Sequence, residues 1–108
     1  SDLDAATRQQ LSRGERLVEV LKQGKFVPQP VEEQVVQIYA GTHGFLDELP
    51  TESIGRYQQE LISYMKAERG SILSDIVAKG KLDDALESQL DDALKAFAEI
   101  FEPKQQDD

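Results

Sequence analysis

The sequence predicts an all-α fold, a single bundle of about five helices joined by short loops. Apolar residues recur every three or four positions in five successive stretches, which is the spacing of one face of a helix. Proline, glycine or a capping residue separates each stretch from the next. No stretch shows the alternation of a convincing β-strand. The predicted helices span roughly residues 3–23, 31–43, 52–68, 71–79 and 84–101.

The first predicted helix opens on acidic residues and ends at a glycine. Ser1 or Asp2 can accept hydrogen bonds from its free N–H groups. Gly14 interrupts its middle at a cost of about 1 kcal/mol relative to alanine, so we expect a neighbouring helix to pass close there. Gly24 follows Lys22 at the position where a left-handed residue commonly ends a helix. The residues that form its stripe are Leu3, Thr7, Leu11, Gly14, Leu17, Val18 and Leu21.

The stretch 30–50 is the most apolar, and we interpret it as the helix on which the others pack. Pro30 is well placed to open it. Val36 and Leu46 widen its apolar side, which is typical of a helix touched by several others. Gly41 and Gly44 predict a break or a close neighbour in its second half. The predicted stripe is Val31, Val35, Ile38, Tyr39, Thr42, Phe45 and Leu49.

Local signals also predict the ends of the remaining helices. Thr51 is suited to be the N-cap of the third helix, and Asp83 that of the last. We expect a break near Gly70 and a helix end at Gly80. The last helix has the most regular stripe of the chain, formed by Leu86, Leu90, Ala93, Leu94, Phe97, Ile100 and Phe101.

Length and composition limit what the chain can be. Its 108 residues suffice for one domain, predicted over 1–102, with a polar and disordered tail at 103–108. Twelve basic residues against 21 acidic ones give a net charge of −9, which argues against nucleic acid as a partner. No apolar run is long enough to cross a membrane. The chain has no cysteine, so disulfides and thiolate metal sites are excluded.

Catalytic and metal-binding groups are scarce. His43 is the single histidine, and we interpret it as a surface residue beside a helix end. The dipeptides Gly24-Lys25 and Gly80-Lys81 lack the spacing of a phosphate loop, so both are interpreted as helix ends. Two acidic groups lack the calcium-loop pattern and fall on the polar face of the last helix; they are Asp83, Asp84 and Glu87, and Asp91 and Asp92. We therefore predict no catalytic residue and no metal site.

Three stretches, in this order and spacing, resemble the C-terminal domain of the alpha subunit of F-type ATP synthase. They read SDLDAATRQQLSRGERLVEVLKQGKF, PVEEQVVQIYAGTHGFLDELP and YMKAERGSILSDIVAKGKLDDALESQLDDALKAFAEIF. The resemblance implies a helical bundle in a ring of three alpha and three beta subunits around the gamma subunit of the central stalk. A nucleotide-binding core is expected before Ser1. This domain would carry out no bond-making chemistry itself. It would help to hold the ring together, guide the rotor and complete a nucleotide pocket.

The same resemblance implies the cofactors, partners and location. The parent subunit would bind ATP or ADP with magnesium, whereas this stretch alone would bind none. Its partners would be the beta subunits, the gamma subunit and other subunits of the complex. The complex would be a peripheral membrane assembly on the cytoplasmic face of the bacterial inner membrane, or on the matrix or stroma side in an organelle, without insertion of this domain into the membrane.

Two sites are implied residue by residue. The first is a stalk-facing turn formed by Ser1, Asp2, Leu3 and Asp4, for which a plain helix N-cap is the structural alternative. The second is the adenine side of the non-catalytic nucleotide site, formed by Gln23, Gly24 and Lys25. Lys25 departs from a glutamine of the family, so it keeps donors but loses an acceptor. The alternative there is a helix C-cap with a solvent-facing glutamine.

A second interpretation is a stand-alone acidic helical module that offers an apolar groove to a partner helix. Composition fits both interpretations. The reading frame before Ser1 discriminates between them, since a phosphate loop upstream would favour the ATP synthase subunit. An enzyme complete within these residues is disfavoured by the single histidine and the missing cysteines.

Overall fold

A computed structural model of the chain describes residues 4–23 and 28–101, without the side chain of Gln23. It confirms the all-α prediction, and no strand occurs within these residues. The helices are α1 (Ala5–Gln23), α2 (Val31–Thr42), the short 3-10 helix η1 (Thr51–Ser53), α3 (Ile54–Glu68), α4 (Gly70–Lys79) and α5 (Asp84–Ile100). Each α-helix agrees with its predicted bounds within about two residues, which is the usual uncertainty of helix ends.

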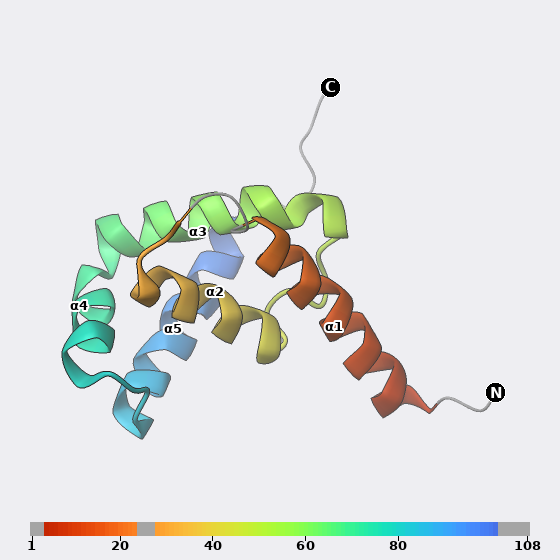
Figure 1. The fold of residues 1–108 in the computed structure, drawn as a ribbon, viewed down its shortest axis with the longest axis horizontal. Helices are drawn as coiled ribbons and strands as arrows, with labels where there is room; N and C mark the ends of the chain where they lie inside the picture. The colour runs from red at the N-terminus through yellow and green to blue at the C-terminus, as the bar shows by residue number, and fades with distance from the viewer. Residues whose placement is uncertain (1–3, 24–27, 102–108) are drawn as a thin grey trace.

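The helices pack as one bundle, with α1 at its edge (Figure 1). α1 packs against α2 and α3, whereas α4 packs against α2, α3 and α5. The N-terminal end of α1 lies away from the other helices (Figure 1). The largest fully buried side chains come from α2, α3, α5 and the turn after α2; they are Val36, Leu46, Ile54, Leu61, Met65, Leu86, Leu90 and Leu94. The core is therefore built with little contribution from α1.

The predicted stripe of α5 is confirmed except at Ile100. Leu86, Leu90, Ala93, Leu94, Phe97 and Phe101 are buried, whereas Ile100 is 63% exposed. The helix ends there, because the next residue, Phe101, has extended backbone and turns its ring back against Tyr57 and Phe97. Ile100 thus lies outside the packed face at the last turn.

The predicted stripe of α2 is only partly right. Tyr39 is buried, but Val31, Ile38 and Thr42 are exposed. The buried face is instead formed by Glu33, Val36, Gln37, Tyr39, Ala40 and Gly41. Apolar residues surround most of this helix, so their period alone does not fix which side faces the core. Polar partners from α3 decide it, because they satisfy the buried carboxylate and amide.

The predicted stripe of α1 is mostly exposed. Leu11, Val18 and Leu21 are each more than half exposed, whereas Val20 is buried. Two arginines fix the inner side of α1. Arg13 Nε lies 3.1 Å from Asp47 Oδ2, and Arg16 Nε donates to the carbonyl oxygens of Leu46 (2.9 Å) and Leu49 (3.0 Å). The turn after α2 therefore holds α1 through hydrogen bonds rather than through the predicted apolar stripe.

The described glycines show the predicted breaks, whereas Gly24 lies outside the described residues. Gly44 (φ +88°) and Gly80 (φ +69°) are left-handed and follow α2 and α4. A Cβ at Gly41 would lie 3.3 Å from Cδ1 of Leu17, so α1 passes close to it. At Gly14 the expected neighbouring helix is missing, since no described atom lies within 4 Å of a Cβ built there.

One of the predicted caps needs correction, and another lies outside the described residues. Asp4 accepts a hydrogen bond from the Thr7 N–H at 2.8 Å, whereas the predicted capping residues Ser1 and Asp2 are not described. Thr51 makes no N-cap for α3, because Pro50 directs the chain into η1 first and no side chain caps either helix.

The Asp83 cap of α5 is confirmed and predicts a pH effect. Its Oδ1 accepts from the Leu86 N–H at 2.9 Å, and its Oδ2 lies 3.0 Å from Lys79 Nζ. Both contacts hold the pKa of Asp83 below its ordinary value of 3.8, the cap bond first. A lowered folded pKa stabilises the fold above the unfolded value, and the effect is lost as the pH falls through the folded value.

We therefore expect Asp83→Asn, which keeps a cap oxygen, to lower the melting temperature near neutral pH and to match the unchanged protein once the pH falls below the folded pKa of Asp83. Melting curves by circular dichroism near neutral pH and in acid below that pKa measure this. A difference in melting temperature of the same size in both conditions would show that the charge of Asp83 does not contribute to stability.

Tyr57 carries a hydroxyl that finds no partner among the described residues. Its ring is 3% exposed and meets those of Phe97 and Phe101 edge-on, with centroids 5.2 Å away in each case. Burial raises the pKa of Tyr57, so the hydroxyl stays protonated. A buried polar group without a partner costs free energy that an apolar ring would not.

Replacing Tyr57 by phenylalanine is therefore expected to leave the free energy of unfolding unchanged or to raise it by about 1 kcal/mol, as measured by urea unfolding. Tyr39→Phe is the matched control, because the Tyr39 hydroxyl donates to Asp91 Oδ1 at 2.6 Å. That change should cost about 1.5 kcal/mol. Equal losses in both variants would mean that Tyr57 has a hydrogen-bond partner.

Candidate functional site

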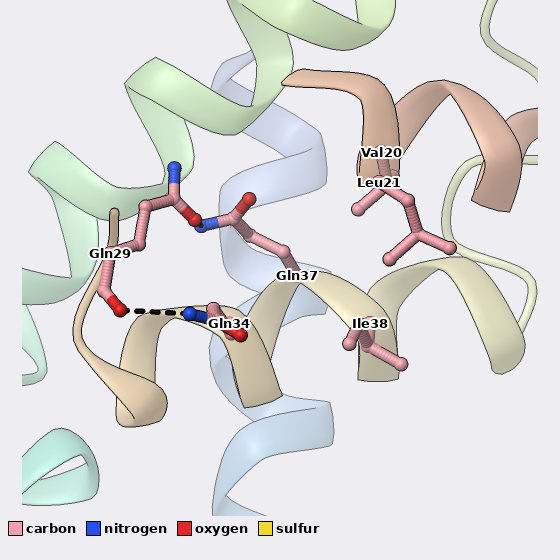
Figure 2. A pocket seen from close by; sticks show the side chains of 6 residues that line it. All are labelled: Val20, Leu21, Gln29, Gln34, Gln37 and Ile38. Atoms are coloured by element: carbon pink, nitrogen blue, oxygen red, sulfur yellow. Dashed lines mark hydrogen bonds between the residues drawn. The ribbon is translucent and has the colours of Figure 1, made fainter. Parts of the chain in front are cut away.

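The candidate site is a hollow of about 230 Å³ between the end of α1 and the side of α2. Figure 2 shows three glutamines on one side of it and three apolar side chains on the other. The end of α1 supplies Val20 and Leu21, the link before α2 supplies Gln29, and α2 supplies Gln34, Gln37 and Ile38. The site therefore combines amide groups with an apolar wall, and none of its six lining residues is charged.

A chain of amide hydrogen bonds fixes the polar side. Gln34 Nε2 donates to the backbone carbonyl of Gln29 at 2.8 Å, and Gln37 Nε2 donates to the side-chain oxygen of Gln29 at 3.2 Å (Figure 2). Gln58 of α3 in turn donates through Nε2 to Oε1 of Gln37. Gln37 and Gln58 are almost fully buried. The side-chain amide of Gln37, which lines the hollow, is thus held in place by Gln58 of α3.

Gln58 also connects the site to α1 and to a second hollow. Its Nε2 lies 3.5 Å from the carbonyl oxygen of Val20, while its Oε1 has no partner among the described residues. The second hollow, about 370 Å³, is lined by Gln29, Glu33, Gln37, Gly55, Gln58, Gln59, Ile62 and Ser63. Glu33 there pairs with Lys66 at 3.2 Å. Gln29 and Gln37 lie between the two hollows, because they line both.

The first hollow suits a flat, neutral group with hydrogen-bonding edges. An amide both donates and accepts, so it can match either kind of edge atom. Aliphatic side chains such as Leu21 and Ile38 offer contact area to a ring face. Because none of the described residues that line the hollow is a cation, they offer no charged partner to a phosphate group.

His43, the single histidine of the chain, lies outside this hollow. His43 follows α2 and is exposed; its ring stacks on Tyr39 with centroids 3.8 Å apart. This confirms the interpretation as a surface residue beside a helix end. Burial, and then the hydrogen bond to Asp91, raise the pKa of Tyr39, so its hydroxyl remains a donor. Within the described residues, no cluster of three metal-binding side chains is found, and no helix is long and apolar enough to cross a membrane.

Residues 1–97 match the family described as "ATP synthase alpha/beta chain, C terminal domain". The chain belongs to this family. Among curated proteins, it is 52% identical over 103 residues to ATP synthase subunit alpha of Aquifex aeolicus. It is 44% identical over 101 residues to that of Syntrophomonas wolfei and 45% over 102 residues to that of Streptomyces griseus. These matches confirm the resemblance to the alpha subunit.

The matches cover 94–95% of this chain but 20% of each relative. The chain therefore spans about one fifth of the length of the relatives that it matches.

The family's implied site residues are only partly within the described structure. Gln23 is the last residue of α1, two positions after Leu21 of the hollow, but its side chain lies outside the description. Gly24 and Lys25 lie outside it entirely, as do Ser1, Asp2 and Leu3. Asp4 is exposed and caps α1, which is the structural alternative considered for it.

The sequence interpretation missed the glutamines at positions 29, 34, 37 and 58. Gln34 and Gln37 are three apart on one helix, and this spacing places them on a common side. That spacing, on an otherwise apolar helix, was the available signal. Gln58 gave none, since it meets Gln37 only through the packing of α3 on α2.

Proposed function

We propose that this chain is the C-terminal helical part of an alpha subunit in a rotary ATP synthase. The domain itself carries out no bond-making chemistry. It helps to assemble the alpha/beta ring around the central stalk and completes a regulatory, non-catalytic nucleotide pocket during proton-driven ATP synthesis. Matches to alpha subunits over 94–95% of the chain support this role over that of a stand-alone interaction module.

The hollow between α1 and α2 is the observation that carries the pocket proposal. α1 ends at Gln23, so the link that follows leaves from the wall formed by Val20 and Leu21. In this proposal Gln23, Gly24 and Lys25 close over the adenine ring. Lys25 offers only donors where the family has a glutamine, so the acceptor comes from Gln23.

The remaining parts of the proposal follow from the family. The parent subunit binds ATP or ADP with magnesium. The phosphates of the nucleotide contact the nucleotide-binding core that is expected before this domain. Beta subunits and the gamma subunit are the partners, with Ser1–Asp4 as the turn that faces the stalk. Asp4 is exposed and directly precedes α1, whose N-terminal end lies away from the other helices (Figure 1), and this supports the assignment. The assembly is a peripheral membrane complex on the cytoplasmic side, or on the corresponding side in an organelle.

Calorimetry with ATP tests the pocket. The 108-residue chain should show no measurable binding, because it holds one wall of the site without the phosphate contacts. The full-length subunit should bind, and Gln23→Ala in that subunit should weaken binding about three- to tenfold through the loss of one hydrogen bond. Gln89→Ala on the exposed side of α5 is the control and should leave binding unchanged.

Tight ATP binding by the 108-residue chain would contradict the proposal that the pocket is shared with another domain. Unchanged affinity for ATP in the full-length subunit with Gln23→Ala would show that Gln23 makes no contact with the adenine ring.

A further inference from the structure

The amide groups at the first hollow are not equally free to meet a ligand. Gln37 has both ends of its amide engaged, because its Oε1 accepts from Gln58 and its Nε2 donates to Gln29 Oε1 at 3.2 Å. The Nε2 of Gln29 turns toward α3, whose residues line the second hollow together with Gln29 (Figure 2). Both amides are thus occupied by the hydrogen-bond chain or directed to the other hollow.

Gln34 differs from these two, and its amide is held in one orientation. Its Nε2 donates to the backbone carbonyl of Gln29 at 2.8 Å. A carbonyl oxygen accepts and cannot donate, so the end of the amide that faces it has to be the nitrogen. The Oε1 of Gln34 therefore lies on the other side, toward Ile38 (Figure 2), and no hydrogen bond within the described residues uses it. The hollow thus presents a fixed hydrogen-bond acceptor.

The apolar wall places a ring beside this acceptor. Leu21 and Ile38 are 57% and 37% exposed, so both have surface left to cover a ring. Gln34 and Ile38 are four positions apart on α2, and this spacing makes them neighbours on one face of the helix. A ring that packs on Ile38 therefore lies next to the amide of Gln34.

We propose that Gln34 is a specificity-determining residue of the nucleotide pocket, whose Oε1 accepts a hydrogen bond from the 6-amino group of the base. This inference rests on the proposed function. Adenine carries an amino group at position 6, which donates, whereas guanine and hypoxanthine carry an oxygen there, which accepts. An oxygen placed against Oε1 of Gln34 would lose its hydrogen bonds to water and gain none. The hollow therefore takes a 6-aminopurine in preference to a 6-oxopurine.

The two side chains assigned to the adenine contact in the link do not make this selection themselves. Gln23 can both donate and accept, so it fits either kind of base. Lys25 only donates, so it fits an oxygen at position 6 at least as well as an amino group. A fixed acceptor such as Oε1 of Gln34 supplies the discrimination that these two residues lack.

Calorimetry of the full-length subunit with ATP and with inosine triphosphate, which has an oxygen in place of the 6-amino group, tests the proposal. The unchanged subunit should bind ATP about tenfold more tightly. Gln34→Met keeps the length of the side chain without its strong acceptor, so it should weaken ATP binding about three- to tenfold and change inosine triphosphate binding about twofold or less. Gln34 is exposed, and an unchanged melting temperature would report that the variant is folded.

A third nucleotide and a control variant sharpen the comparison. Purine riboside triphosphate has no group at position 6, so the unchanged subunit should bind it about as weakly as Gln34→Met binds ATP, and the substitution should not weaken it further. Gln89→Met, on the exposed side of α5, is the matched control and should leave the ratio of the ATP and inosine triphosphate affinities unchanged.

Equal weakening of ATP and inosine triphosphate by Gln34→Met would overturn the proposal, because a merely structural role of Gln34 would affect both alike. A ratio of affinities near one in the unchanged subunit would also overturn it. A ratio that falls with Gln59→Met, at the second hollow, and not with Gln34→Met would place the base in the second hollow instead. In each of these cases ATP still binds and Gln23→Ala still weakens it, whereas failure of the pocket proposal itself would leave Gln23→Ala without effect.

Discussion

Replacing Leu90 by alanine is expected to lower the free energy of unfolding by about 2–5 kcal/mol. Leu90 lies in the middle of α5 and is fully buried. The change removes buried apolar surface and leaves a cavity, because the surrounding side chains relax only in part. A small domain is stable by only about 5–15 kcal/mol, so the loss should be evident in urea unfolding.

Ile100→Ala is the matched control for Leu90, since it removes an aliphatic side chain of equal size from the same helix. Ile100 is 63% exposed, so its replacement should change the free energy of unfolding by about 0.5 kcal/mol or less. Similar losses at both positions would contradict the packing of α5 through the face that contains Leu90.

α5 could be predicted from sequence because its signals are local and agree with one another. Its apolar residues define a single face, and Asp83 caps it within three residues of its partner, Leu86. Gly80 likewise ends α4 through its own backbone conformation. Helix bounds depend on such short-range chemistry, so no knowledge of the tertiary structure was needed.

The inward faces of α1 and α2 could not be predicted in the same way. On the buried side of α2, Glu33 pairs with Lys66 of α3, which is distant in the sequence. α1 is oriented by Arg16, whose acceptors are 30 and 33 residues away. Periodicity identifies an apolar side but not the contact that covers it, and polar anchors at long range leave no periodic pattern.

The candidate site likewise depends on contacts that sequence alone does not reveal. Gln23 and Asp4 entered through resemblance to a family, because a single amide or carboxylate has no specific pattern. The amide chain from Gln58 to Gln37 joins residues 21 apart on two helices. Such a chain exists only after α3 packs on α2, so its sequence signal is limited to the presence of glutamine on an apolar helix.

Replacing Gly44 by alanine is expected to lower the free energy of unfolding by about 1–3 kcal/mol. Gly44 has φ +88°, a conformation that strains residues with a Cβ. The added Cβ would also meet the terminal nitrogen Nη2 of Arg13, which would have to shift. The effect therefore combines backbone strain with a displacement of the end of the Arg13 side chain. Urea unfolding measures it, and a fall smaller than about 0.5 kcal/mol would contradict it.

Gly14→Ala is the informative counterpart, because the same substitution should have the opposite sign. Gly14 lies in helical backbone with open space around it, so alanine should raise the free energy of unfolding of the 108-residue chain by about 0.5–1 kcal/mol. A loss in the 108-residue chain would contradict the open surroundings of Gly14.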